Sequence, residues 1–108
     1  MNIETDAIIS ALKNILSDTP TVERAMLFGS RARGDNKERS DYDIAIFGKV
    51  TAEDKSAIFT QTEELPTLLK IDVAYVDELE KDKFVENILK EGITFYDRTR
   101  WKQNHEFL

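Results

Sequence analysis

The sequence predicts an α/β (α+β) fold, a small mixed β-sheet flanked by helices, because two kinds of apolar pattern alternate along it. Apolar residues recur at helical spacing in residues 3–17, 52–65 and 79–90. Short apolar runs of strand length occur outside these segments, at residues 25–28, 41–47, 70–76 and 93–96. A chain of 108 residues has room for one core, so residues 1–108 are expected to form a single domain.

The expected helices pack through apolar stripes. In residues 3–17 the stripe consists of Ile8, Ala11, Leu12, Ile15 and Leu16. The second helix starts near Ala52, is limited by Pro66, and is expected to bury Ile58 and Phe59. The third runs from about Leu79 to Lys90 and presents Phe84, Val85, Ile88 and Leu89. Gly92 suits the position just after its end, where a left-handed residue often terminates a helix.

Alternation along two expected strands separates an apolar face from a face that carries carboxylates. Side chains two apart point the same way, so one face of residues 41–47 carries Tyr42, Ile44 and Ile46. The opposite face carries Asp41, Asp43, Ala45 and Phe47. In residues 70–76 one face carries Ile71, Val73 and Tyr75, and the other carries Asp72, Ala74 and Val76.

Composition and charge exclude several classes of protein. Cysteine is absent, which removes disulfides and thiolate metal sites. No apolar run reaches membrane-spanning length, and the N-terminus lacks the blocks of a signal peptide, so a cytoplasmic protein is expected. The net charge of −6 argues against a protein that holds nucleic acid by its overall field. Small polyphosphates remain possible ligands, since residues 31–39 are locally basic and bound cations reverse the local sign.

Asp41, Asp43 and Asp72 lie in apolar strands, where carboxylates are uncommon. Residues two apart on a strand face the same way with Cα atoms about 6.5–7 Å apart. Two such charges about 5 Å apart repel by roughly 3 kcal/mol at an effective dielectric of 20. Folding gains nothing from this repulsion, but Mg²⁺ prefers hard oxygen ligands and substrate phosphates. If residue 72 comes from a neighbouring strand of that face, the three carboxylates form a candidate metal site.

Gly29 and Ser30 form a second candidate element at an expected strand-to-helix turn. Glycine lets a phosphate approach the backbone, and the free N–H groups of the following turn point toward that anion. The serine hydroxyl can add a donor. Arg31 and Arg33 follow, and a guanidinium suits phosphate oxygens. Beside a metal site, these residues predict metal-assisted phosphoryl or nucleotidyl transfer.

Each part has an ordinary structural interpretation when it is taken alone. Gly29–Ser30 would be a turn, and the arginines would be solvated. Asp43 could pair with Arg39, and Asp72 could pair with Lys70. The joint pattern of Gly-Ser, ten residues, Asp-x-Asp and a later strand Asp is far more demanding, and it favours the functional interpretation.

The segment LFGSRARGDNKERSDYDIAIFG resembles the minimal nucleotidyltransferase family (MNT, MntA-like antitoxins) of the DNA polymerase β superfamily. The resemblance implies a polymerase-β-type nucleotidyltransferase fold and two Mg²⁺ ions, with ATP as the substrate. Asp41 and Asp43 would hold the ion that binds the triphosphate, and Asp43 with Asp72 the ion near the attacking hydroxyl. The remaining roles implied are nucleotide binding by Gly29 and Ser30 and, as charge partners, by Arg31 and Arg33.

The resemblance also implies a biological setting. Proteins of the family commonly pair with a HEPN-domain protein. In toxin–antitoxin pairs the family member is the antitoxin of a HEPN ribonuclease toxin, and the family's reaction is adenylylation of a tyrosine hydroxyl on that toxin. Two alternatives stay open: a non-catalytic nucleotide-binding module that sequesters its partner, and an enzyme that modifies an antibiotic-type small molecule. Membrane association and direct binding of nucleic acid are not expected. Base preference, Mg²⁺ against Mn²⁺, and oligomeric state are not legible in the sequence.

The C-terminal segment, residues 98–108, is too polar to assign to an element. It is expected to be a flexible or partner-docking tail. His105 is expected to be solvated rather than catalytic, and Trp101, Phe107 and Leu108 could dock on the domain or on a partner.

Overall fold

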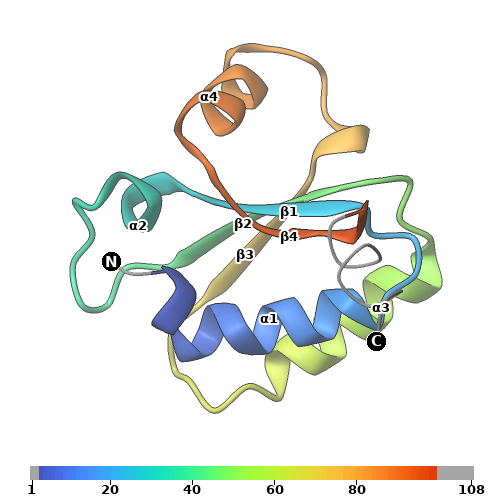
Figure 1. Ribbon diagram of the computed structural model, residues 1–108, viewed down its shortest axis with the longest axis horizontal. Coiled ribbons are helices and arrows are strands. Elements are labelled where there is room, and N and C mark those ends of the chain that lie inside the picture. The colour runs from blue at the N-terminus through green and yellow to red at the C-terminus, as the bar shows by residue number, and fades with distance from the viewer. Residues whose placement is uncertain (1–2, 100–108) are drawn as a thin grey trace.

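The structure is a computed structural model that describes residues 3–99 (Figure 1). Along the chain the elements are η1 (Ile3–Thr5), α1 (Ala7–Ser17), β1 (Arg24–Phe28), α2 (Gly29–Arg33), β2 (Tyr42–Phe47), α3 (Ala52–Glu63), β3 (Ile71–Tyr75), η2 (Val76–Glu78), α4 (Lys83–Glu91) and β4 (Ile93–Asp97). The expected alternation of helices and strands is confirmed. The tail expected at 98–108 lies, from residue 100 onward, outside the described residues.

The strands form a four-stranded mixed sheet in the order β3-β2-β1-β4. β1 runs antiparallel to both β2 and β4, whereas β2 and β3 run parallel. α1 and α3 lie on one side of the sheet, α4 lies on the other, and α2 stands at the end of β1 (Figure 1). The predicted small mixed sheet flanked by helices is therefore confirmed.

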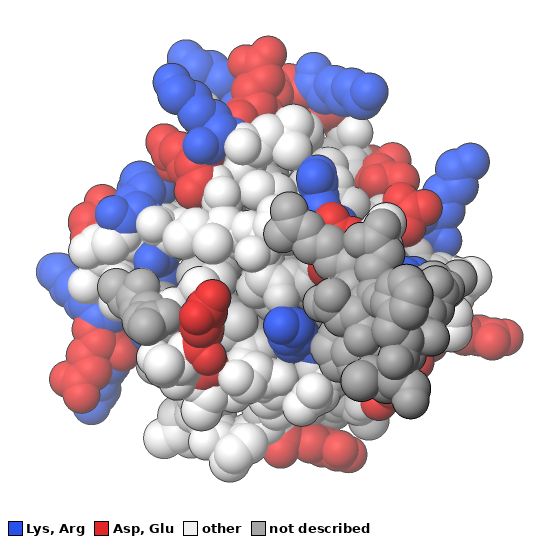
Figure 2. Space-filling model, in the orientation of Figure 1, with Lys and Arg blue, Asp and Glu red and all other residues white. Residues whose placement is uncertain are grey.

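Charged side chains of both signs occur on the face of the molecule seen in Figure 2. On the face in view, Figure 2 shows Lys and Arg interspersed with Asp and Glu around the rim, with uncharged residues across the centre. In this view the Lys and Arg side chains of residues 3–99 do not line up in a stripe of the kind that tracks a nucleic-acid backbone. No helix among residues 3–99 combines the length and the apolar character needed to cross a bilayer.

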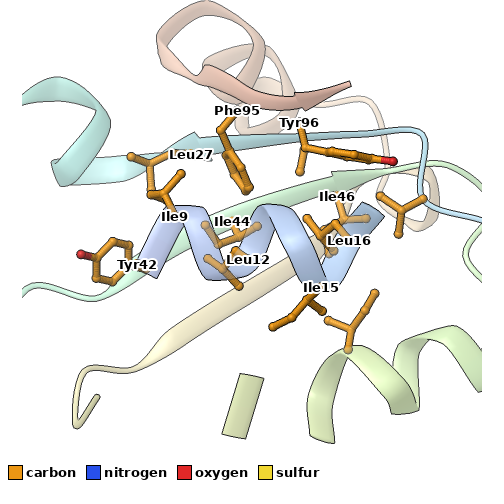
Figure 3. Close-up of a cluster of buried hydrophobic side chains, with 13 residues drawn as sticks. Ile9, Leu12, Ile15, Leu16, Leu27, Tyr42, Ile44, Ile46, Phe95 and Tyr96 are labelled. Carbon is orange, nitrogen blue, oxygen red and sulfur yellow. The ribbon is translucent and has the colours of Figure 1, made fainter. Parts of the chain in front are cut away.

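The main core lies between the sheet and the layer of α1 and α3 (Figure 3). Leu12 and Leu16 of α1 pack there against the apolar face of β2, which contributes Tyr42, Ile44 and Ile46. β3 adds Ile71, Val73 and Tyr75 to the same side. The opposite side holds a smaller cluster of Met26, Ala45 and Ile88, with Phe28, Phe47 and Val76 against it. The alternation predicted for β2 and β3 is confirmed, so Asp43 and Asp72 lie on the α4 side.

Side-chain caps decide where the helices begin. The Asp6 carboxylate accepts from the Ile9 amide at 2.9 Å and starts α1 at Ala7, so a single helix over residues 3–17 was wrong at its N-terminus. The Asp82 carboxylate accepts from the amides of Phe84 and Val85 and starts α4 at Lys83, not at Leu79.

Several apolar residues assigned to the core are exposed. Ile58 is buried as predicted, but its neighbour Phe59 is 65% exposed, because α3 lies at the edge of the core and turns little more than one row of side chains toward it. On α4, Val85 and Ile88 are buried, whereas Phe84 and Leu89 remain about half exposed. The reason given for Gly92 was also wrong: its φ is −72°, and it is required because a Cβ would lie 2.5 Å from the Ile88 carbonyl oxygen.

The neighbours Ile58 and Phe59 provide a matched test of this packing. We expect Ile58→Ala to lower the free energy of unfolding by about 2–5 kcal/mol, because it leaves a cavity in the main core. Phe59→Ala on the same helix should change it by less than about 0.5 kcal/mol. Urea denaturation of both variants measures the difference, and equal losses would contradict the exposure of Phe59.

Candidate active site

Strand register brings the predicted site residues to one end of the sheet. Asp43, the second residue of β2, is paired on one side with Phe28 at the end of β1 and on the other with Asp72 of β3. Residues paired across neighbouring strands lie about 5 Å apart with side chains on the same face. Because Gly29 follows Phe28 directly, the Gly29–Ser30 turn begins beside Asp43.

Gly29 is in contact with the Asp43 carboxylate. A Cβ placed on Gly29 would lie 2.3 Å from Asp43 Oδ2, and the backbone there has φ +74°, so both space and conformation require glycine. α2 starts at Gly29, and no described side chain caps its first amides. Ser30 is half-buried beside them. The turn therefore presents unsatisfied N–H donors immediately beside a carboxylate.

The pKa of Asp43 is raised above its ordinary value. Burial is the largest cause, followed by the negative charges of Asp72 and Asp41; the positive charges of Arg33 and Lys70 act in the opposite sense. The negative charges of Asp72 and Asp41 therefore lie close enough to Asp43 to disfavour its ionisation. A cation placed among them would relieve that repulsion, and their hard oxygen donors suit Mg²⁺.

The carboxylates are not closed around a common point. Within residues 3–99 no three acidic or histidine side chains are arranged to hold a metal ion. Asp72 instead pairs with Lys70, whose Nζ lies 3.1 Å from Asp72 Oδ1, as its spacing on the strand suggested. Lys70 therefore offsets the charge of Asp72 within this open arrangement.

The two arginines predicted to bind nucleotide are placed differently. Arg33 is exposed, carries ion pairs to Asp35 (3.3 Å) and Glu91 (3.6 Å), and its charge reaches Asp43. Arg31 is only 8% exposed and donates to the carbonyl oxygens of the loop before β2. Arg33 is thus available to an anion at the turn, whereas the guanidinium of Arg31 is already engaged.

A groove of about 580 Å³ lies elsewhere on the α4 side of the sheet. Residues of β1, β2, η2 and α4 line it, among them Arg24, Phe47, Val76 and Leu89. Phe47 is four residues along β2 from Asp43, which the strand rise converts to about 13 Å. The groove is therefore separate from the carboxylates.

The comparisons with known proteins agree with this geometry. The family model described as "Polymerase beta, Nucleotidyltransferase" matches residues 10–100. None of the curated proteins matches the sequence at a significant level.

Solved structures resemble the fold at low sequence identity. A toxin–antitoxin structure with AMP-PNP matches at a TM-score of 0.67 and 19% identity, over 95% of this chain and 79% of that one. A mutant of the toxin–antitoxin MntA–HpeT matches at 0.60 and 17%, over 83% and 73%. A protein from Sulfolobus solfataricus, provisionally assigned as a nucleotidyltransferase, matches at 0.50 and 22%, over 93% and 92%. At these identities the likeness establishes the fold.

The contact at Gly29 generates a test with a matched control. Gly29→Ala should weaken binding of Mn²⁺ with AMP-PNP at least about tenfold, because the new methyl group displaces the Asp43 carboxylate. Gly34→Ala is the control: Gly34 also has positive φ (+86°), but no atom lies within 4 Å of an added Cβ. Both variants carry backbone strain of about 1–3 kcal/mol, so binding measured by calorimetry separates the two effects. Equal loss of binding would contradict the proposed contact.

The raised pKa of Asp43 generates a test of stability. The folded, cation-free protein binds a proton at this carboxyl more tightly than the unfolded chain does, so the ionised form destabilises the fold above the folded pKa. Asp43→Asn should therefore raise the free energy of unfolding at pH 7 in EDTA by at most about 1 kcal/mol, because solvent screens the repulsion at this partly exposed carboxyl. The gain should vanish as pH falls through the folded pKa, and saturating Mg²⁺ should stabilise only the original protein. Urea denaturation with and without Mg²⁺ measures both; a loss of stability in EDTA would refute the account.

Proposed function

The chain belongs to the polymerase β nucleotidyltransferase family, and on that premise we propose that it uses Mg²⁺ to transfer AMP from ATP onto a hydroxyl group. The observation that carries the proposal is the contact of Gly29 with the Asp43 carboxylate, in register with Asp72. It puts a turn suited to phosphates beside carboxylates suited to cations. Transfer of a nucleotidyl group needs little beyond such positioning and charge neutralisation.

The roles are those that the family resemblance implies for these residues. Asp41 and Asp43 would hold the cation that accompanies the triphosphate, and Asp43 with Asp72 a second one beside the acceptor. Bound Mg²⁺ supplies neutralisation of phosphate charge and a lower pKa for the acceptor hydroxyl. Uncapped amides of the turn at Gly29 and Ser30 would bind the β and γ phosphates.

The proposed transfer exchanges one phosphate ester bond for another and needs no reactant beyond ATP and the acceptor. The acceptor oxygen forms a bond to the α-phosphorus of ATP, the bond to the bridging oxygen breaks, and pyrophosphate leaves with that electron pair. The acceptor's proton passes to solvent, or to a carboxylate of the cluster. Arg33 is exposed next to the turn and would offset the charge of the departing pyrophosphate.

We further propose that the acceptor is a tyrosine hydroxyl of a HEPN-domain partner, so that the protein acts as the antitoxin of a toxin–antitoxin pair. Two observations support this: the segment around residues 27–47 resembles MntA-like antitoxins, and similar structures are described as toxin–antitoxins. ATP is favoured as the donor because one of those structures is described with AMP-PNP.

One observation favours a second candidate, a non-catalytic module that covers its partner. The Lys70–Asp72 ion pair offsets the charge of the third carboxylate with a side chain of this protein. A module of this kind would bind the partner equally well with its carboxylates removed. An enzyme would require them.

Label transfer distinguishes the two. The full chain, co-expressed with a HEPN-domain protein, is incubated with Mg²⁺ and ATP labelled at either the α or the γ phosphate. We expect α label, and no γ label, on the HEPN-domain protein, because pyrophosphate is the leaving group.

The variants Asp43→Asn and Asp18→Asn complete the design. Asp43→Asn should reduce labelling at least about 100-fold, while Asp18→Asn makes the same change of net charge at an exposed position after α1 and should leave labelling unchanged. Inhibition of the HEPN-domain protein without label, unaffected by Asp43→Asn, would overturn the enzyme in favour of the module.

A further inference from the structure

We propose that Arg31 is a positioning residue, which ties the loop of residues 34–40 to α2 and thereby holds Asp41 and Asp43 against the Gly29–Ser30 turn. The inference rests on the proposed function for the identity of the site. It differs from the role that the sequence predicts for Arg31, that of a charge partner of the nucleotide.

The guanidinium of Arg31 is engaged by the loop. Its Nε and Nη2 donate to the Ser40 carbonyl at 3.1 and 2.9 Å, and Nη2 also donates to the Glu38 carbonyl at 3.2 Å. A charged group that is only 8% exposed is costly unless its donors are satisfied, so these bonds are a condition of its burial. Ser40 is the residue directly before Asp41, so the bonds act on the backbone that carries the first carboxylate.

The Arg31 guanidinium also stacks on the ring of Tyr42. The Arg31 guanidinium carbon lies 4.1 Å from the centre of the Tyr42 ring, a stacking that favours the planar arginine side chain. Tyr42 is itself buried, and it separates Asp41 from Asp43 along the chain. Arg31 therefore contacts the residues on both sides of Asp41.

The arrangement is anchored in the main core. The Tyr42 hydroxyl donates to Asp6 Oδ2 at 2.8 Å, and Asp6 is also the cap of α1. The loop is thus connected through Arg31, Tyr42 and Asp6 to the first helix.

Arg33, by contrast, has a guanidinium that an incoming phosphate can reach. Its side chain is 45% exposed and its ion pairs are with exposed carboxylates, contacts that a phosphate can replace. Arg31 would have to give up its hydrogen bonds to the Ser40 and Glu38 carbonyl oxygens to reach a phosphate. The geometry therefore separates two arginines that the sequence presents as equivalent.

The experiment compares Arg31→Met with the matched variant Arg33→Met in the full chain. Loop order is measured by limited trypsin digestion after Lys37 and Arg39, which both lie in the loop. The reference is cleavage after Arg24 in β1, which requires global unfolding. Cation binding is measured with Mn²⁺ alone by electron paramagnetic resonance. Triphosphate binding is measured with AMP-PNP at saturating Mn²⁺.

We expect opposite patterns from the two variants. Arg31→Met should speed relative loop cleavage several-fold and weaken Mn²⁺ binding by about 10- to 100-fold, as the loss of a residue that orients metal ligands usually does. Its effect on AMP-PNP at saturating Mn²⁺ should be small. Arg33→Met should weaken AMP-PNP binding, leave loop cleavage unchanged and not weaken Mn²⁺ binding, because it removes a positive charge near Asp43.

Arg31→Lys keeps the test decisive if Arg31→Met fails to fold. Lysine preserves the charge but cannot reproduce the forked donors or the planar stacking, so a positioning role predicts faster loop cleavage and weaker Mn²⁺ binding. A phosphate-binding role predicts that lysine substitutes well. Weakened AMP-PNP binding with an unchanged loop and unchanged Mn²⁺ affinity would overturn the proposal. Loop and Mn²⁺ effects in a protein that transfers no label would instead uphold Arg31 as a positioning residue and reject the proposed reaction.

Discussion

The pairing of β2 with β1 on one side and with β3 on the other is the constraint on which the site depends. It sets Asp43 opposite Phe28, and hence against Gly29, and sets the same residue opposite Asp72. A shift of either register by one residue would turn the partner side chain to the other face of the sheet. The apolar faces of β2 and β3 prevent such a shift, because it would expose Ile44 and Ile46. Packing against α1 therefore secures the geometry of the opposite face.

The site also brings negative charges together, at a cost to the stability of the fold. Asp43 is half-buried beside two other carboxylates, and the balancing charges come from exposed side chains, Arg33 and Lys70. Exposed ion pairs of this type contribute little to stability. A protein selected for stability alone would not assemble such a cluster, whereas one that binds a cation and a triphosphate gains the missing positive charge with its substrate.

The loop between the Gly-Ser and Asp-x-Asp parts of the pattern separates them along the chain, and it is also held in place by hydrogen bonds to Arg31. Arg31 and Tyr42 lie next to residues with proposed chemical roles, yet both point into the protein. Alternate residues of one short segment thus serve two purposes: one set carries the candidate site residues, and the other attaches the segment to the core. The sequence allowed an ion pair between Lys70 and Asp72, because the two residues are two apart on a strand. Only the structure shows that the pair forms.

What the sequence by itself determined was local: the strand and helix segments, the two faces of residues 41–47 and 70–76, and the three carboxylates with the Gly29–Ser30 turn as candidates. These follow from spacings of two to four residues, which the chain carries wherever it folds. Only the tertiary structure decided that β3 lies parallel beside β2, that Phe59 faces solvent, and that Arg31 and Arg33 point to different partners. Those outcomes depend on which distant segment packs against each residue, and periodicity along the chain does not encode that choice.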